Sequence, residues 1–289
     1  MSSGIVEAWK LYNDERSGVL FVVEDVTYNI CEQRAHEFKI KKLNPKIKVF
    51  RRSLTQLIAA ATLDVNKELI LDGNIIAVVY YRSGYEPSQY PTEAEWNVRL
   101  MMERSKAIKC PSIQYHLAGT KKIQQVLTQP GVVEKFLNGE KISSRVRKIY
   151  TGMYPLDFTV EGDRAIEMAI ENPENFVLKP QREGGGNNIF GKNIKTFLTS
   201  IKGKKERTSW ILMDKIYPPS QKNYFIRPGS DDYEKIDADY EVGIFGVIIG
   251  DSRNIYFNKE AGYMVRSKPV TANEGGRLSG GALSSIYLV

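Results

Sequence analysis

A short apolar strand that runs into three consecutive glycines constrains this chain more than any other stretch. Residues 176–190 read FVLKPQREGGGNNIF, and Pro180 cannot donate to a sheet ladder, so it ends the strand. Gly184, Gly185 and Gly186 cost conformational entropy and contribute nothing to a core. Such a run is useful where backbone N–H groups must approach a bulky anion such as a triphosphate. The stretch therefore predicts a strand that leads into a phosphate-binding loop.

Charged side chains flank these glycines. Lys179 supplies a mobile cation for phosphate oxygens, and Glu183 is a hard oxygen ligand of the kind that Mg²⁺ takes. Neither the GK[ST] ending of a Walker A loop nor the dinucleotide fingerprint G-x-G-x-x-G is present. A glycine-rich lid over ATP fits the stretch, and the alternative interpretation is a flexible surface turn.

Composition limits the class of protein. The 289 residues suffice for one large or two medium domains, and 42% hydrophobic with 26% charged residues is ordinary for a globular protein. We expect no membrane span, because no run approaches about 18 apolar residues. The N-terminal stretch lacks a basic segment followed by a long apolar core, so it does not read as a secretory signal. Cys31 and Cys110 form no disulfide framework and are expected as buried thiols.

The net charge of +7 is concentrated in two basic clusters, residues 39–52 and 192–207. A nucleic-acid interface is one interpretation, but neither cluster interleaves aromatic residues in a stacking pattern. Solvated faces are the simpler interpretation. An anionic nucleotide or peptide substrate also fits a mild positive excess.

The first part of the chain alternates between strands and helices. Residues 19–23 (VLFVV) and 75–81 (IIAVVYY) are apolar runs typical of buried strands, and 30–38 reads as a helix that Asn29 caps. This alternation predicts a small, mostly parallel sheet. Ligands bind beyond the carboxyl ends of such strands. Asn29 and Gln33 follow the first strand, so we expect them at that rim.

The segment Arg82-Ser83-Gly84-Tyr85 follows the second apolar run. An arginine, a glycine and a tyrosine at this edge either hold a carboxylate or form an ordinary loop. Farther along, Lys121 begins a helix that Thr120 is expected to cap. Lys121 is either a surface lysine or a lysine that points toward a phosphate.

The last part of the chain is rich in strands. The run 241–249 predicts a central strand, and separate strands are expected over 255–258 and 263–268. Arg266 and Lys268 lie two residues apart and share one face of the latter. Two cations on one face are unfavourable unless an anion lies between them, and a solvated edge is the alternative. A second glycine-rich loop, 273–282, suits a flap that closes over a ligand.

These stretches together resemble the eukaryotic glutathione synthetases. The resemblance is carried by LAGTKK, FVLKPQREGGGNN, ILMDKI, EVGIFGV, NICEQRA, YYRSGY and the terminal Gly-Gly loop, and it covers essentially the whole chain. It implies an α/β (α+β) chain with an ATP-grasp fold. A small parallel-sheet substrate-binding domain would span 18–116. An ATP-grasp domain would span 117–289, with a glycine-rich lid at about 154–236.

The resemblance also implies an activity, which is the joining of γ-glutamylcysteine to glycine with ATP and Mg²⁺ by a cytosolic homodimer. The dipeptide carboxylate attacks the γ-phosphate to give an acyl phosphate, and the glycine amine then displaces phosphate. No side-chain nucleophile is needed, so catalysis comes from positioning and charge neutralisation. The residues implied to stabilise the reacting groups are Lys179, Arg266 and Lys268, and Glu183 is the implied Mg²⁺ ligand.

The resemblance assigns the other site residues in two sets. The implied nucleotide contacts are Lys121, Lys179, Pro180, Gln181, Arg182, Glu183, Gly184, Gly185, Gly186, Asn187, Asn188, Phe190, Met213, Asp214, Lys215, Ile216, Glu241, Lys268 and Glu274. The implied dipeptide and product contacts are Thr27, Tyr28, Asn29, Gln33, Arg82, Ser83, Gly84, Tyr85, Arg266, Arg277 and Leu278.

Three departures from the family pattern bear on activity. The chain begins well inside the family's length, so we expect further Mg²⁺ ligands to be missing and catalysis to be weak. Thr27 stands where the family usually has an acidic contact, and Arg277 and Leu278 stand where it has Val and Ala. The alternatives are a diverged ligase with another acceptor amino acid, or a catalytically weak protein that binds ATP or a thiol peptide.

Overall fold

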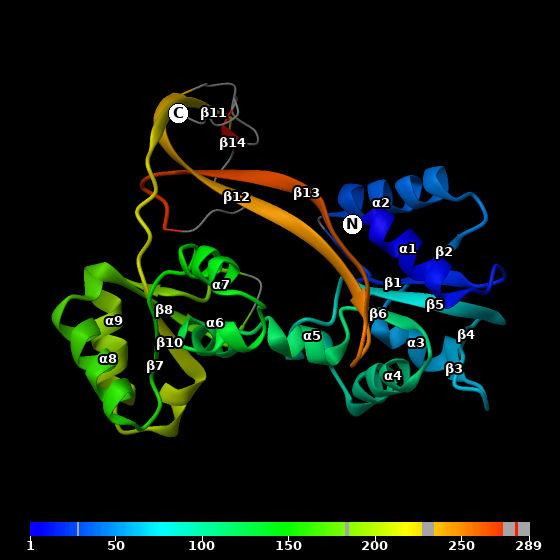
Figure 1. Ribbon diagram of the computed structural model, residues 1–289, viewed down its shortest axis with the longest axis horizontal. Helices are drawn as coiled ribbons and strands as arrows, with labels where there is room; N and C mark the ends of the chain where they lie inside the picture. Colours follow the sequence, from blue (N-terminus) through cyan, green and yellow to red (C-terminus); the bar gives the residue numbers. More distant parts are fainter. Residues whose placement is uncertain (28, 183–184, 227–233, 274–280, 283–289) are drawn as a thin grey trace. The chain divides into compact units, whose positions relative to one another are not determined.

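The computed structural model describes residues 1–27, 29–182, 185–226, 234–273 and 281–282 (Figure 1). The chain divides into two compact units, one of residues 1–116 with 243–264 and the other of residues 117–242 with 265–289. The boundary at residue 116 lies inside α5 (Ile113–Ala118). The assignment of a substrate-binding and an ATP-grasp domain stays a prediction.

A six-stranded sheet forms the first unit. Its strands lie in the order β2 (Lys48–Arg52), β1 (Gly18–Val22), β5 (Asn74–Tyr81), β4 (Leu69–Leu71) and β3 (Ala61–Leu63), and β6 (Ile108–Cys110) also pairs with β5. β1, β2, β5 and β6 are parallel, while β4 pairs antiparallel with β5 and β3 pairs antiparallel with β4. The chain leaves β1 for β2 on one side and returns to β5 on the other. The carboxyl ends of β1 and β5 thus flank a switch point of the kind at which open sheets bind ligands.

Apolar side chains fill both faces of this sheet. All five residues of β1 are buried, and Leu20 and Val22 join one core cluster while Val19 and Phe21 join another. α3 (Leu54–Ala60) and α4 (Glu93–Arg104) cover the first face, and α1 (Ser2–Tyr12) and α2 (Ile30–Leu43) cover the second (Figure 1). A strand buried on both faces needs a continuous apolar run, which is why the sequence identified it.

A four-stranded antiparallel sheet organises the second unit. Its order is β7 (Met153–Pro155), β10 (Trp210–Asp214), β8 (Phe176–Pro180) and β9 (Ile189–Phe190). Leu178 and Leu212 pack with Ile166 of α8 (Val160–Glu171) and Leu198 of α9 (Lys192–Ile201). This unit also contains α6 (Lys121–Thr128), α7 (Glu140–Arg147) and the 3-10 turns Val133–Lys135, Pro173–Asn175 and Lys205–Ser209, whereas the 3-10 turn Pro87–Gln89 belongs to the first unit.

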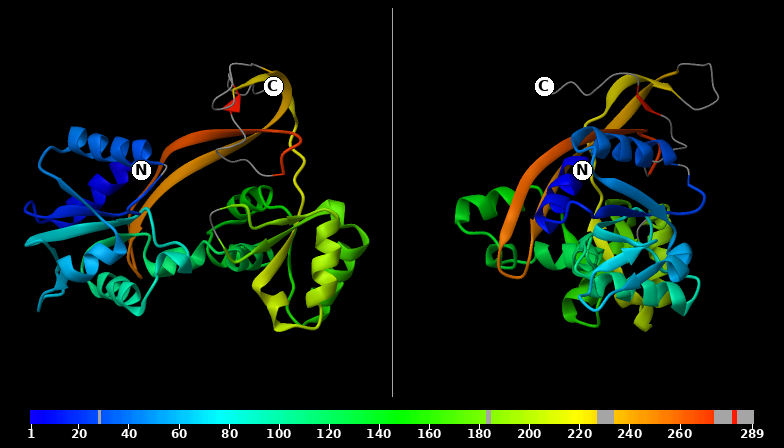
Figure 2. Two further views of the ribbon diagram at one scale, coloured as in Figure 1. Left: turned by 180° about the vertical axis from the view of Figure 1, so that it is seen from behind. Right: turned by 90° about the vertical axis from the view of Figure 1, so that its right-hand side faces the viewer.

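The third sheet has the order β13 (Ile255–Pro269), β12 (Glu234–Gly250), β11 (Gln221–Ile226) and β14 (Gly281–Ala282). β12 and β13 run side by side as one long hairpin (Figures 1 and 2). The prediction of two separate strands over 255–258 and 263–268 is wrong, because β13 is continuous. β12 is central in the sheet order as predicted, but alternate residues such as Ile244 and Ile248 are exposed. Its apolar run therefore does not mark a strand buried on both faces.

Candidate functional site

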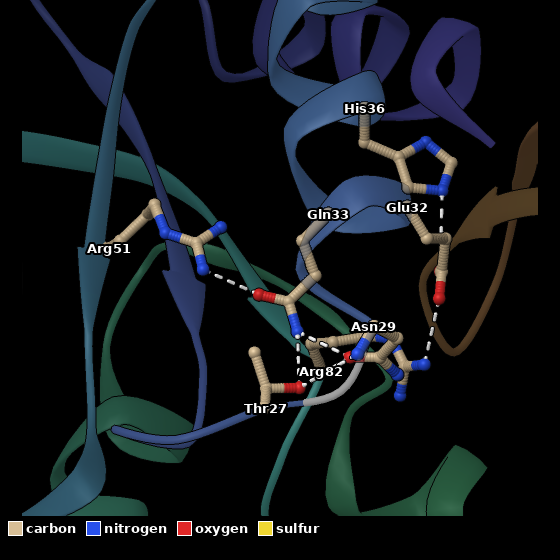
Figure 3. A network of polar contacts seen from close by, with 7 residues as sticks. All are labelled: Thr27, Asn29, Glu32, Gln33, His36, Arg51 and Arg82. Atoms are coloured by element: carbon tan, nitrogen blue, oxygen red, sulfur yellow. Dashed lines mark hydrogen bonds and ion pairs between the residues drawn. The ribbon is translucent and has the colours of Figure 1, made fainter.

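Three predicted substrate residues meet at the carboxyl end of β1 (Figure 3). Gln33 Nε2 donates to Asn29 Oδ1 at 2.8 Å and to Thr27 Oγ1 at 3.3 Å, and Thr27 Oγ1 donates to Asn29 Oδ1 at 2.5 Å. Asn29 occupies the N-cap position of α2, but its side chain makes no cap hydrogen bond. The predicted capping role is therefore wrong, because the Asn29 oxygen is engaged by Thr27 and Gln33 instead.

Arg51, at the end of β2, completes this network. Its Nη2 donates to Gln33 Oε1 at 2.6 Å, and its Nη1 lies 4.0 Å from Glu37 Oε1. The Gln33 residue is only 2% exposed, so its amide is a buried polar group that needs partners at both ends. The network supplies them, and it fixes the amide in one orientation.

Arg82 follows β5 and ends a second chain of polar contacts. Its Nη2 donates to Glu32 Oε2 at 2.9 Å, and Glu32 Oε1 lies 3.7 Å from His36 Nε2. His36 Nδ1 is hydrogen-bonded to Ser2 Oγ at 2.8 Å. Burial lowers the pKa of His36 below its usual value. The guanidinium predicted to bind a ligand carboxylate is thus held by a carboxylate of the protein (Figure 3).

Gln89 organises the loop that follows β5. Its Oε1 accepts from the backbone N–H groups of Gly84 at 2.7 Å, Tyr85 at 2.9 Å and Glu86 at 3.4 Å. Gly84 has a φ of 90°, which side-chain-bearing residues rarely adopt, and Ser83 is buried. Because Gln89 occupies these N–H groups, a carboxylate at this edge would depend on the Arg82 side chain.

The glycine-rich stretch joins two antiparallel strands of the second unit. Lys179 lies in β8 opposite Ile211 of β10 and is half-buried, and Pro180 ends the strand as predicted. Gln181 Oε1 accepts from the backbone N–H of Lys122 at 3.1 Å. Lys121 is the first residue of α6. Thr120 holds the N-cap position without a side-chain cap bond, so its predicted capping role is wrong.

The remaining residues of this stretch differ in exposure. Arg182, Gly185 and Gly186 are exposed, while Asn187, Asn188 and Phe190 are half-buried.

The predicted adenine strand is the end of β10. Met213 and Asp214 are its last residues, and Asp214 Oδ2 accepts from the backbone N–H of Gly152 at 3.1 Å. The backbone N–H of Lys215 donates to the Asn175 carbonyl at 2.8 Å. Ile216, which follows, is exposed. Backbone contacts therefore hold this segment just beyond the strand.

Carboxylates of β12 face the two cations of β13. Arg266 forms an ion pair with Glu241, and Lys268 Nζ lies 3.4 Å from Asp239 Oδ2 and donates to the Ala272 carbonyl at 2.6 Å. The two carboxylates, Asp239 and Glu241, offset the repulsion expected between two cations on one strand face. Glu241, predicted as a ribose acceptor, is thus engaged by Arg266. These residues and Lys179 lie on separate sheets.

Several predicted residues lie outside the described residues, and these are Tyr28, Glu183, Gly184, Glu274, Arg277 and Leu278. Within the described ranges, no group of three or more His, Cys, Asp or Glu side chains could hold a metal ion. Two cavities, of about 660 Å³ beside α7 and about 460 Å³ beside the end of α1, are lined by none of the predicted site residues. Cys31 is exposed, so the prediction of a buried thiol is wrong there. Cys110 is exposed as a residue, but burial raises the pKa of its thiol, so the prediction holds in part for that sulfur.

Comparison with known proteins identifies the family. Residues 1–288 match the family model described as eukaryotic glutathione synthase, ATP binding domain. This chain belongs to the eukaryotic glutathione synthase family. Glutathione synthetase of Xenopus laevis is 43% identical over 99% of this chain and 60% of its own length. That of Homo sapiens is 42% identical over 98% of this chain and 59% of its own length. The chain thus spans about 60% of the length of these relatives.

A solved glutathione synthetase-like protein shares the fold. The apo form of a glutathione synthetase-like effector from Globodera pallida superposes with a TM-score of 0.73 at 25% identity, covering 93% of this chain and 58% of that one. The predicted family resemblance and the α/β fold class are confirmed. Among the described helices, none is long and apolar enough to cross a membrane.

Sequence reasoning missed four residues around the candidate site. They are Glu32, Arg51, Gln89 and Asp239, each of which contacts a predicted ligand residue. Asp239 could have been found from the sequence. It lies two residues before Glu241, just as Arg266 lies two residues before Lys268, so each pair shares one face of its strand. The other contacts depend on which strand ends become neighbours, and no local pattern encodes that.

Proposed function

We propose that this chain carries the ATP- and dipeptide-binding machinery of a glutathione synthetase, which joins γ-glutamylcysteine to glycine. The observation that carries the proposal is the hydrogen-bond network of Thr27, Asn29 and Gln33 at the β1 switch point. The resemblance assigns these residues to the dipeptide, the strand pattern independently predicts Asn29 and Gln33 at the sheet rim, and the three lie together where the sheet topology favours a ligand. The family match across residues 1–288 supports the same function.

The proposed reaction is carboxylate activation by an ATP-grasp ligase. The C-terminal carboxylate of γ-glutamylcysteine attacks the γ-phosphorus of ATP, so a C–O–P bond forms and ADP leaves. The amine of glycine then attacks the acyl carbon, loses a proton, and displaces inorganic phosphate. Lys121, Lys179 and Lys268 would neutralise phosphate oxygens, and Arg82 and Arg266 would hold carboxylates.

Ligand binding must rearrange the charges that the structure shows. Arg82, Arg266 and Lys268 are each paired with a carboxylate of the chain. An incoming anion would share or replace those partners, which keep the cations oriented beforehand. Most of these side chains are partly exposed, so the exchange is inexpensive in free energy.

Three further parts of the proposal rest on the resemblance. Glu183 would hold Mg²⁺, which would supply positive charge beside the phosphates; the described acidic residues form no metal cluster of their own. A homodimer and a cytoplasmic location are also proposed. Another acceptor amino acid, or binding without catalysis, is not favoured, because the matched relatives are glutathione synthetases.

Binding measurements test this proposal. Thermal unfolding should shift upward with ATP only when Mg²⁺ is present, and titration with γ-glutamylcysteine should show saturable binding. Lys179→Gln should remove most of the ATP stabilisation, whereas Lys195→Gln, an exposed lysine of α9, should retain it. Stabilisation that ignores Mg²⁺, or no binding of the dipeptide, would contradict the proposal.

A further inference from the structure

The Gln33 amide lies between a cation and two neutral polar side chains. Its oxygen accepts from Arg51, and its nitrogen donates to Asn29 and Thr27 (Figure 3). A guanidinium has donors and no acceptor, so a carboxamide that faces it must present its oxygen. Arg51 therefore decides that the nitrogen of Gln33 faces Asn29.

The same polarity passes on to Asn29. Its Oδ1 accepts from both Gln33 Nε2 and Thr27 Oγ1. Its Nδ2 is the other end of the same planar amide and is directed away from these donors. Asn29 is half-buried and follows the carboxyl end of β1, and the end of its amide that these two donors leave over is the N–H end.

Arg51 is itself held in place. β2 pairs in parallel with β1, which sets Arg51 opposite Phe21. Its Nη1 lies 4.0 Å from Glu37 Oε1, within range of the opposite charge but without a hydrogen bond among the described residues. Glu37 also pairs with Arg34. The side chains of Arg51 and Glu37 are 20% and 6% exposed. Separating buried opposite charges is costly, so the Glu37 carboxylate favours keeping the Arg51 guanidinium at this position, where its Nη2 donates to Gln33.

We propose that Arg51 is a positioning residue for peptide binding. Through Gln33 it turns Asn29 so that the Asn29 amide N–H meets a carboxylate or peptide carbonyl of the ligand. The inference rests on the proposed function, which places γ-glutamylcysteine at this edge. Arg82 follows the neighbouring strand and is a second donor, so both groups suit a ligand rich in acceptors. Arg51 does not touch the ligand and acts only through the two amides.

Substitutions in the full chain distinguish the hydrogen-bond direction of the two amides from simple side-chain packing. Arg51→Met removes the donor and retains much of the side-chain length. Gln33→Glu still accepts from Arg51 but cannot donate to Asn29, so the Asn29 amide reverses and offers its oxygen to the ligand. Arg51→Lys keeps one donor. Arg52→Met is the matched control, because Arg52 is the next residue of β2 and its side chain contacts Asp72 at 2.6 Å and the backbone carbonyl of Arg51 at 2.8 Å, while the side-chain bonds that join Arg51, Gln33 and Asn29 do not involve it.

The dissociation constant of γ-glutamylcysteine is the main measurement. Arg51→Met and Gln33→Glu should each raise it about tenfold, the effect of one lost hydrogen bond to a charged group, while ATP affinity stays unchanged. Arg51→Lys should stay within about threefold of the parent, and Arg52→Met within about twofold. Unchanged peptide affinity in Arg51→Met, or an equal loss in Arg52→Met, would overturn the inference.

Amide signals test the polarity independently of the ligand. In ¹⁵N-labelled, ligand-free protein, the side-chain NH₂ resonances of Gln33 and Asn29 should shift in Arg51→Met and stay in place in Arg52→Met. Unchanged signals would refute the role of Arg51, whether or not the parent chain binds the dipeptide. Failure of the parent chain to bind the dipeptide would count against the proposed function alone. If Arg51→Met loses ATP binding as well, the Gln33→Glu variant becomes the test. An unaltered dissociation constant of γ-glutamylcysteine in Gln33→Glu would then overturn the inference.

Discussion

Replacing Arg207 with methionine should strongly destabilise the second unit. Arg207 is 2% exposed and donates to three backbone carbonyls, those of Leu156 at 2.7 Å, Lys202 at 3.0 Å and Asp157 at 3.1 Å. Methionine fills similar space but leaves these carbonyls without their donor. A hydrogen bond to a charged group contributes about 1.5 kcal/mol, so the three together amount to about 4.5 kcal/mol. The ion pair with Asp163 adds little, because that carboxylate is 55% exposed.

Urea unfolding followed by circular dichroism measures this loss. In a thermal scan, a loss of about 4.5 kcal/mol lowers the melting temperature of a unit of this size by about 9–18 °C. Arg164→Met is the control, since Arg164 is an exposed residue of α8, and it should change stability by less than about 0.5 kcal/mol. A loss below about 1 kcal/mol for Arg207→Met would refute the reasoning that these three bonds fasten the connections around β7, α8 and α9.

Three other predictions concern the ligand-binding residues. Lys268→Gln should raise the dissociation constant of Mg-ATP about tenfold by titration, because a phosphate contact is lost; unchanged affinity would remove Lys268 from the site. Glu32→Gln should lower the dissociation constant of γ-glutamylcysteine about threefold, because Arg82 is no longer neutralised; weaker binding would show that Glu32 mainly positions Arg82. Burial lowers the pKa of folded His36, so the unfolded chain takes up the proton first and stability falls as pH drops below about 6.5. Urea unfolding at pH 7.5 and 5.5 should show a smaller difference for His36→Gln than for the parent, and equal differences would contradict this.

Local sequence patterns predicted the features of the fold that depend on residues close together in the chain. The run 19–23 predicted β1 because a strand covered on both faces needs apolar residues throughout. Pro180 ended β8 because proline cannot donate to the ladder. Gln33 and Asn29 were placed at the sheet rim because they follow a parallel strand, and the structure joins them by a hydrogen bond.

Other features depend on neighbours distant in the sequence. Asn29 and Thr120 are residues typical of helix caps, yet neither side chain makes the capping bond. Arg51 lies eighteen residues after its partner Gln33, and only the pairing of β2 with β1 brings the two together. The alternating exposure of β12 follows from its place in a hairpin whose one face is uncovered, which its composition does not reveal.

A product assay tests the central claim most directly. The purified chain is incubated with γ-glutamylcysteine, Mg-ATP and an equimolar mixture of amino acids, and phosphate release is followed together with the mass of any new peptide. The account predicts glutathione as the product, formed with one phosphate released per peptide. A different tripeptide would contradict the assignment of glycine as the acceptor. Absence of phosphate release while ATP and γ-glutamylcysteine are bound would contradict the claim that this chain is a ligase.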